Sequence, residues 1–493
     1  MTILKIPKQI KYSDIQEKKS LSPSNYKSFE IERKNKKKLK YFLRDKISHN
    51  KGQEPGSISY VKNSDIAFIR NSCINNIDII CNKNKTLFLN PNHNFKNKVN
   101  DGDILLCRDA NIGEVCIFLN EENDNKKYVY SSGIVKLNFK SDEYKYYCLA
   151  MMKDSYFINQ LDALTPKGST IRHSGDLFLE CSIPFLDQGE EWAYELFGNI
   201  VKNICYSEFY CNKKLRESEN IIDRELMTKK YVYNNPAFID INKEKRLDAG
   251  IYSEKVFQWK SNVKNYKNGC KSIEELGFDL KRGPNLAKRD LGRSIKTDVW
   301  KKNFNILVYP SDISDSGYID KHVYLGARNK IWFLENKNIL FSAEGTVGKT
   351  FIICDEKMKF TTNFHGTIIY PKNNEVNIEI AIFIGLYLNY LKTKGILEKM
   401  SVGGNGGSFA IGYWDYIDVP NFDDKLIKEI SELYNNECNL NPISFDKSLI
   451  SKSGIFQLNL FRMKCNDMLK ILIRDIKSGN LKSKEYYLNY KDI

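Results

Sequence analysis

A chain of 493 residues can bury more than one hydrophobic core, so two to four domains are expected. Lys and Arg (76) outnumber Asp and Glu (61), and the net charge of +15 favours a polyanionic partner, although Asn, Lys and Ile are abundant throughout. Twelve cysteines without a CxxC pair argue against a zinc site or a disulfide framework, and the absence of a signal-like or membrane-spanning segment predicts a cytoplasmic protein.

Residues 1–40 are polar and rich in lysine, and we expect a basic, largely solvated arm. From Tyr41 onward, short β-type runs alternate with Gly, Asn and Asp, and one helical pattern at 144–161 interrupts them. This mixture predicts an α+β domain at 41–186.

A long helix is predicted at 187–230, where no proline interrupts an apolar pattern with three- and four-residue spacing. The apolar positions are Trp192, Leu196, Ile200, Ile204, Leu215, Ile222 and Leu226. Roughly forty residues would span about 60 Å, so a partner helix along the apolar face is expected. Residues 231–246 are expected to form a linker.

A second α+β domain is predicted at 247–422, because its segments repeat those of the first domain in the same order. The strongest match aligns ILLCRDANIGEVCIF (104–118) with ILFSAEGTVGKTFII (339–353) without a gap, and each copy predicts a β-hairpin. Further matches join 66–79 to 306–320, 131–139 to 364–372, 144–161 to 378–395, 168–185 to 406–422, and 21–26 to 247–252.

Three glycine and proline matches anchor this repeat. Gly133 is matched with Gly366, and Pro184 with Pro420. Gly168 is matched either with Gly407, which shortens the second loop, or with Gly404, which leaves no gap.

Residues 423–493 return to helical spacing, with a break at 439–445. The predicted order is therefore domain, helix, domain, helix. We expect an α+β fold in which two similar domains, each a twisted β-sheet with helices, are separated by long antiparallel helices in a pseudo-two-fold arrangement.

Short motifs that suggest an enzyme are weak. AEGTVGKT (343–350) fits a relaxed phosphate-loop pattern, so a nucleotide hydrolase that uses Lys349 is one alternative, but a β-type run follows where a helix is required. The fragment 335–337 (ENK) could belong to a nuclease, and NNPAF (234–238) lacks the second proline of the methyltransferase loop that it resembles.

The five histidines are dispersed and predict neither a metal site nor a catalytic constellation. They are His49, His93, His173, His322 and His365. His173, beside Arg172, could contact DNA or simply cap its loop. Two basic domains joined by helices, with no evident active site, favour binding and positioning over catalysis.

The repeated segments resemble the specificity subunit of type I restriction-modification enzymes. The two hairpin segments are similar to that family's DILLSRxGxIGKV pattern, and GSTIRHSGDLFLECSIPF (168–185) is similar to the stretch that closes each recognition domain. RLDAGIY (246–252) resembles the family's lead-in. This sequence departs from the family's pattern in two places. The second domain lacks the TIRH portion of the closing stretch, and the C-terminal helical region is broken.

The resemblance implies a non-catalytic subunit with two target recognition domains, each reading one half of a split DNA target. It also implies double-stranded DNA and two methyltransferase subunits as partners, with restriction (motor) subunits as optional ones. S-adenosylmethionine would be bound by the methyltransferase subunits, and no cofactor is expected in this chain. A recognition subunit of another DNA methylation or phage-defence assembly is the alternative.

Arg, Lys, Asn and Ser in loops can pair with base edges in the major groove, which nominates DNA-binding residues. In the first domain they are Arg70, Arg108, Lys167, Ser169 and Arg172, and in the second Arg328, Lys349, Asn405 and Ser408. For each of them, a solvated surface group is the competing interpretation. Unequal loops in the two domains predict an asymmetric target.

Overall fold

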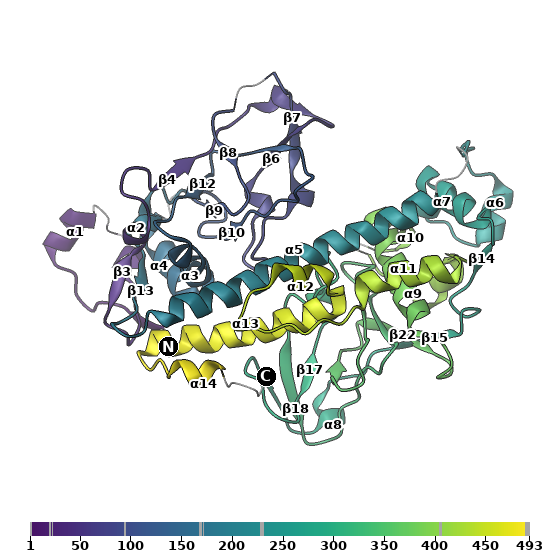
Figure 1. The fold of residues 1–493 in the computed structure, drawn as a ribbon. Coiled ribbons are helices and arrows are strands. Elements are labelled where there is room, and N and C mark those ends of the chain that lie inside the picture. Colours follow the sequence, from purple (N-terminus) through teal and green to yellow (C-terminus); the bar gives the residue numbers. More distant parts are fainter. Residues whose placement is uncertain are drawn as a thin grey trace. The chain divides into compact units, whose positions relative to one another are not determined.

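The computed structural model describes residues 2–18, 21, 23–92, 95–166, 170, 172–226, 231–403 and 407–488, and it is a mixed α/β structure (Figure 1). The chain divides into two compact units. Unit 1 comprises Met1–Phe209, Asn441–Lys447 and Lys464–Ile493, and unit 2 comprises Tyr210–Leu440 and Ser448–Met463.

Unit 1 contains two main β-sheets, with strand orders β10-β9-β12-β4 and β5-β7-β6-β11-β8. In the second sheet β6 and β11 are parallel, and the other neighbouring strands are antiparallel. The strands are β4 (His49–Lys51), β5 (Tyr60–Val61), β6 (Ile66–Ile69), β7 (Leu87–Leu89), β8 (Lys98–Val99), β9 (Ile104–Cys107), β10 (Val115–Ile117), β11 (Lys127–Tyr130) and β12 (Ile134–Leu137).

Both faces of β6 are covered, which explains its uninterrupted apolar run IAFI. Side chains of a strand point alternately to its two faces. Ala67 and Ile69 belong to a buried cluster that includes Leu105 and Cys107 of β9. Ile66 and Phe68 belong to a second cluster on the other face, with Leu89 and Val129. A buried core of unit 1 therefore lies between its two sheets.

Two helices occupy the stretch for which one helix was predicted. They are α3 (Asp142–Lys153) and α4 (Ser155–Leu164). Asp154 separates them because its extended backbone (ψ 145°) ends α3, while its side chain accepts a hydrogen bond from the Tyr156 amide at 2.8 Å and caps α4. Periodicity alone did not reveal this cap.

Unit 2 repeats the strand orders of unit 1, except that no strand of its described residues corresponds to β8. Its sheets are β20-β19-β22-β15 and β16-β18-β17-β21, with β17 and β21 parallel like β6 and β11. The strands are β15 (Phe278–Arg282), β16 (Ser294–Thr297), β17 (Asn305–Leu307), β18 (Val323–Ala327), β19 (Ile339–Ser342), β20 (Thr350–Ile352), β21 (Phe360–Thr361) and β22 (Gly366–Pro371). The two predicted hairpins, β9–β10 and β19–β20, are confirmed as antiparallel pairs.

The shorter elements repeat as well. Helices α1 (Tyr12–Lys18) and α6 (Phe238–Glu244) begin 226 residues apart, the same offset that separates the 3₁₀ turns η1 (Pro23–Tyr26) and η6 (Ala249–Tyr252). Residues 231–246, expected to be a linker, thus contain a helix that corresponds to one near the N-terminus. Two-stranded pairs complete the sheets: β1 (Ile3–Lys5) with β2 (Ser28–Glu30), β3 (Lys36–Lys38) with β13 (Ser182–Pro184), and β14 (Cys270–Lys271) with β23 (Val419–Pro420).

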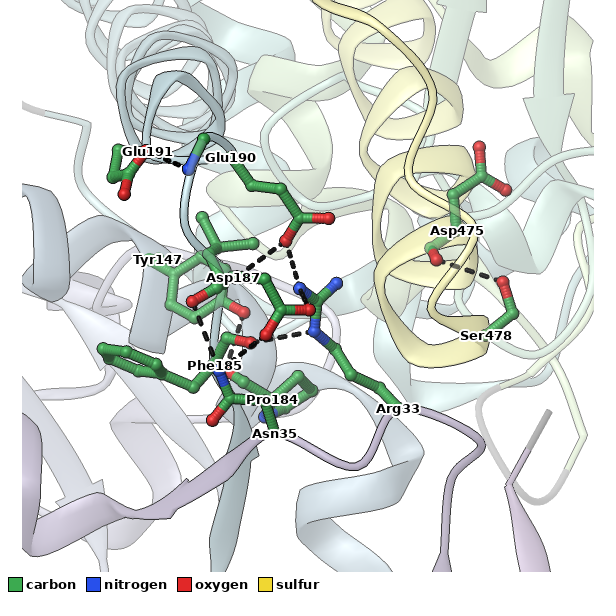
Figure 2. A network of polar contacts seen from close by, with 12 residues as sticks. Arg33, Asn35, Tyr147, Pro184, Phe185, Asp187, Glu190, Glu191, Asp475 and Ser478 are labelled. Carbon is green, nitrogen blue, oxygen red and sulfur yellow. Dashed lines mark hydrogen bonds and ion pairs between the residues drawn. The ribbon is translucent and has the colours of Figure 1, made fainter.

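The N-terminal segment is not a solvated arm throughout, because Arg33 is buried in a polar network (Figure 2). Its side chain is 2% exposed and donates from Nε to the Phe185 carbonyl at 2.8 Å and from Nη2 to the carboxylates of Asp187, at 2.8 Å, and Glu190. The Arg33 amide donates to the Lys477 carbonyl at 3.0 Å. This network attaches the segment after β2 to the residues that follow β13.

The predicted long helix is α5 (Trp192–Leu226), and it contributes residues to both units, as does α13 (Ile455–Ser478). Six of the seven predicted apolar positions of α5 are buried, and Trp192 is half-buried. The predicted break in the C-terminal region is confirmed between α11 (Asp424–Tyr434) and α12 (Lys447–Lys452).

Amide side chains of α5 hold the residues of this break. Asn203 Nδ2 donates to the carbonyls of Asn441, Pro442 and Ser444 at 3.0 to 3.3 Å, and Asn199 Nδ2 donates to Ile443 O at 3.0 Å.

The remaining helices are α2 (Leu39–Phe42), α7 (Glu254–Lys264), α8 (Lys288–Leu291), α9 (Ile378–Thr393), α10 (Ile396–Met400) and α14 (Lys484–Leu488). Among the helices of the described ranges, none combines the length and apolar character needed to cross a membrane.

Candidate nucleic-acid interface

The ends of several strands meet at one edge of unit 1. Arg108, which follows β9, donates its backbone N–H to Gly133 O at 2.9 Å, just before β12. Asn71 lies two residues beyond β6, and its Nδ2 donates to Asp109 O at 2.6 Å. We call this region the strand-end edge of unit 1, defined by Arg70, Asn71, Arg108, Asp109 and Gly133.

Residues 172–176 return to this edge and add charged side chains. The Ala110 amide donates to Arg172 O at 3.0 Å, and the Ser174 amide donates to Arg108 O at 2.9 Å. His173 Nδ1 lies 2.9 Å from Asp109 Oδ1. Asp176 Oδ1 lies 3.5 Å from Arg108 Nη1 and 3.4 Å from Nε2 of His49 on β4. The edge therefore presents hydrogen-bond donors and acceptors of both charges.

Unit 2 builds the same backbone arrangement. The Gly345 amide donates to Gly407 O at 3.1 Å, and the Phe409 amide donates to Ala343 O at 2.8 Å. Its side chains differ, since Glu344 Oε2 lies 2.6 Å from His365 Nδ1 and Glu344 Oε1 lies 3.6 Å from Arg282 Nη1. We call this region the strand-end edge of unit 2, defined by Arg282, Ala343, Glu344, His365 and Ser408.

These bonds identify the equivalent residues of the two closing loops. The Ala110–Arg172 bond of unit 1 corresponds to the Gly345–Gly407 bond of unit 2. Gly345 lies 235 residues after Ala110, and Gly407 lies 235 residues after Arg172. Gly407 is thus the counterpart of Arg172. Gly168 and Gly404, which take part in the two alternative matches predicted from the sequence, lie outside the described residues.

The predicted match of Gly133 with Gly366 is also wrong, by one residue. The hairpin turns are equivalent, because the Gly113 amide donates to Cys107 O and the Gly348 amide donates to Ser342 O. Cys107 pairs with Ile134, whereas Ser342 pairs with Gly366. Ile134 is therefore the counterpart of Gly366. Aligning two glycines by type hid a one-residue difference in segment length.

The predicted DNA-binding residues of unit 1 have different surroundings. Arg70 is exposed and Arg108 is bonded into the strand-end edge, as described above. Arg172 lies beside the edge, but its guanidinium is held by α4 through Asp162 Oδ1 at 2.6 Å. Lys167 and Ser169 lie outside the described residues.

In unit 2 the structure separates the predicted residues. Ser408 lies at the strand-end edge, while Arg328 is exposed after β18. The Lys349 side chain is only 11% exposed, and its Nζ lies 3.8 Å from Asp315 Oδ1. Strand β20 begins directly after Lys349, as expected for a motif that is not a phosphate loop. Asn405 lies outside the described residues.

Several residues at the two edges were not nominated from the sequence: His49, Asn71, Asp109 and Asp176 in unit 1, and Arg282, Glu344 and His365 in unit 2. The dispersed histidines concealed the site, because His49, His173 and His365 reach the edges from distant segments. One signal was available, since Asp109 and Glu344 occupy the same position of the repeated hairpin motif.

The edges are suited to hydrogen bonding rather than metal binding. Within the described ranges, no three His, Cys, Asp or Glu side chains are placed to hold a metal ion. Glu114 of unit 1 is the counterpart of Lys349 in the hairpin of unit 2. Glu114 is half-buried, and this burial raises the pKa of its carboxyl group. Arginine, histidine and carboxylate groups together can pair with both donors and acceptors on base edges.

Comparisons with known proteins find similarity to solved structures. No family model and no curated protein matches this chain. It is similar to the type I restriction-modification system S subunit from M. genitalium, with 12% identity, coverage of 91% of this chain and 96% of that chain, and a TM-score of 0.37.

Two further solved structures are similar to this chain. The HsdS subunit from Thermoanaerobacter tengcongensis has 10% identity, coverage of 91% and 97%, and a TM-score of 0.25. A structure concerning complex assembly and conformational transition of the type I R-M system has 11% identity, coverage of 91% and 98%, and a TM-score of 0.27. Specificity subunits are also the family whose motifs this sequence resembles.

Proposed function

We propose that this chain is a sequence-specific DNA-binding specificity subunit of a type I restriction-modification system. It reads a split, asymmetric target, one half with each unit, and it positions adenine methyltransferase subunits on that target. The chain itself is non-catalytic.

One observation carries the proposal: the same backbone frame occurs twice with different side chains on it. Arg108 and His173 of unit 1 have Ala343 and Ser408 as their counterparts in unit 2. Base edges are distinguished by the donors and acceptors that a protein presents, so two frames with unlike side chains suit two unlike half-sites. The net charge of +15 supports a nucleic-acid partner.

Helices α5 and α13 are assigned to the spacing of the half-sites. Helix α5 has 35 residues, a length of about 50 Å. Residues 192–209 and 464–478 belong to unit 1, and residues 210–226 and 455–463 belong to unit 2. Both helices thus contribute residues to both units.

The remaining partners follow from the family resemblance. Two methyltransferase subunits bind the chain and supply S-adenosylmethionine, restriction subunits are optional, and phage defence is the biological role. A recognition subunit of another methylation assembly has the same requirements for DNA, and the subunits that copurify with the chain distinguish the two. An enzyme that uses Lys349 is disfavoured by the strand that follows it and by its burial.

The DNA-contacting residues are proposed to lie at the strand-end edges. Arg70, Arg108 and Ser408 remain candidates, as do Lys167, Ser169 and Asn405, which lie outside the described residues, and Asp109, His173, Glu344 and His365 are added. Each good bidentate pair with a base contributes about 1–3 kcal/mol of discrimination.

The test is an exchange of residues 41–186 for the corresponding domain of another specificity subunit. The host DNA is then sequenced for methylated motifs. We expect one half of the motif to change and the other half to stay. A change in both halves would contradict independent reading by two units.

A further inference from the structure

Strands β16 and β18 form a ribbon that extends beyond its sheet. Strand β16 pairs with residues 324–327 of β18, from Ser294 opposite Ala327 to Thr297 opposite Tyr324. Strand β17, the other neighbour of β18, pairs only with Val323–Leu325. Residues 326–327 and 294–295 therefore continue as a two-stranded antiparallel extension. We call residues 288–302 and 327–330 the basic ribbon.

Apolar side chains are exposed on this ribbon. Ile295 is 53% exposed, and Val299 and Trp300 in the following turn are 46% and 36% exposed. Neighbouring residues of a strand point to opposite faces, so exposure of both Ile295 and Lys296 leaves both faces of β16 accessible. These side chains add exposed apolar surface to a segment that is otherwise polar.

The ribbon carries a large surplus of positive charge: eight basic residues against Asp290 and Asp298. The basic residues are Lys288, Arg289, Arg293, Lys296, Lys301, Lys302, Arg328 and Lys330. Arg289 Nε lies 3.5 Å from Asp290 Oδ2, but this pair is exposed and therefore weak. Most of the positive charge is thus available to a polyanion.

Unit 1 lacks this charge at the corresponding place. Strands β5 and β7 occupy the sheet positions of β16 and β18. Segment 53–65, which contains β5, has one lysine, Lys62, against Glu54 and Asp65, and segment 87–92 has no charged residue. The basic ribbon is therefore an individual feature of unit 2 and not a requirement of the shared fold.

A contact joins the ribbon to the residues that follow β17. Lys296 Nζ donates to the Tyr309 hydroxyl at 2.6 Å. Tyr309 precedes the 3₁₀ turn after β17 as Arg70, a residue of the strand-end edge of unit 1, precedes the 3₁₀ turn after β6. The major groove of B-DNA admits a two-stranded β-ribbon.

We infer that the basic ribbon is a DNA-binding surface of unit 2 that adjoins its strand-end edge. Its lysines and arginines bind phosphates, and Ile295 and Trp300 contact sugars and base edges. This inference rests on the proposed function, since it requires the chain to bind double-stranded DNA.

A charge-matched pair of variants tests the ribbon in the full-length chain, purified with its copurifying subunits. The ribbon variant carries R289Q, R293Q, K301Q and K302Q. The control carries K255Q, K399Q, K425Q and K428Q, which removes the same charge from exposed positions on α7, α10 and α11 of unit 2. Binding to a duplex with the chain's methylated motif, and to one without it, is measured between about 50 and 200 mM salt.

The ribbon variant is expected to lose affinity for both duplexes alike. The slope of log K against log salt should decrease in magnitude by about 3 to 4, since each lost phosphate contact removes about 0.9. The control should retain most of the wild-type slope. Trp300→Ala should weaken binding several-fold without changing the slope, because it removes an apolar contact and no charge.

Three outcomes would overturn the inference. Equal changes in slope for the ribbon and control variants would mean that DNA affinity depends only on the net charge of the chain and not on the ribbon. The proposed function would still stand in that case if the wild-type complex binds its motif specifically. Loss of copurifying subunits from the ribbon variant, with DNA binding unchanged, would make the ribbon a protein-binding surface. Failure of the wild-type complex to bind either duplex would remove the proposed function as well.

Discussion

His173 of unit 1 and Ser408 of unit 2 occupy equivalent positions, each in an isolated β-bridge with the acidic residue that follows the first strand of the hairpin, Asp109 or Glu344. His173 Nδ1 also lies 2.9 Å from Asp109 Oδ1. An imidazole and a hydroxyl differ in size, charge and hydrogen-bonding pattern. The two edges therefore present different surfaces on one frame.

His173→Ser should alter recognition of one half-site only. If His173 contacts a base, its loss should cost about 1 kcal/mol or more of discrimination at a single position of that half. Methylated-motif sequencing measures this change. Ser408→Ala is the matched variant and should affect the other half, so a change in the same half for both variants would contradict the assignment.

Arg70→Gln should weaken binding of the target duplex by about 1–3 kcal/mol, because Arg70 is exposed at the strand-end edge. Arg172→Gln should have a smaller effect on binding, because Asp162 already holds its guanidinium. Competition binding with the target duplex compares the two. A larger loss for Arg172→Gln would mean that the ion pair with Asp162 opens on DNA.

Three glycine substitutions test the repeated frame. A Cβ atom on Gly52 would lie 2.1 Å from Ser131 O, and one on the equivalent Gly283 would lie 2.1 Å from Asn363 O. Because backbone atoms cannot move aside easily, Gly52→Ala and Gly283→Ala should each destabilise the protein by about 3 kcal/mol or more.

Gly198→Ala is the control, since a Cβ on this residue of α5 meets no atom within 4 Å. It should stabilise the protein by about 0.5–1 kcal/mol because alanine favours the helix. Denaturant unfolding midpoints report all three changes. Similar midpoints for Gly52→Ala and Gly198→Ala would contradict the close approach at Gly52.

Arg33→Ala should lower the free energy of unfolding by about 2–4 kcal/mol, because it removes a buried guanidinium together with its bonds to the Phe185 carbonyl and to the carboxylates of Asp187 and Glu190. Arg33→Lys, which keeps the charge but not the forked geometry, should fall between the wild type and Arg33→Ala. Lys38→Ala is the control, because Lys38 pairs with Glu180 at the surface. This substitution should lower the free energy of unfolding by less than about 1 kcal/mol. An unchanged midpoint for Arg33→Ala would show that the N-terminal segment is not held by this network.

The cysteines should be protected from alkylation in the folded protein. Nine of the twelve are buried, and all are free thiols. Burial raises the pKa of Cys73 to about 12, so its reactive thiolate is scarce at about pH 8 and increases only as the pH approaches that value. Cys438, which is half-exposed, should react first with iodoacetamide.

Mass spectrometry counts the modified thiols. After unfolding without a reductant, all twelve should be labelled. Rapid labelling of Cys73 in the folded protein, or fewer than twelve labels after unfolding, would contradict the buried, disulfide-free core.

Local patterns predicted the elements of the fold well. The hairpins, the long helix and the break in the C-terminal region follow from hydrophobic periodicity and turn residues, which act over a few residues. Arg33 shows where such patterns fail, because a single arginine in a lysine-rich segment looks solvated, and its partners lie about 150 residues further along the chain.

The candidate site was harder to predict, because each edge is assembled from distant segments. Asn71 reaches Asp109 across 38 residues, and Arg108 reaches Asp176 across 68. The repeat located the hairpins but not the side chains around them. A match by residue type also misplaced Gly366 by one residue, and only the strand register corrected it.

Sequencing the methylated bases of host DNA, with and without this chain, tests the central claim most directly. The account predicts a motif that appears only with the chain and consists of two different specified halves separated by unspecified bases. A continuous or palindromic motif would contradict reading by two unlike units.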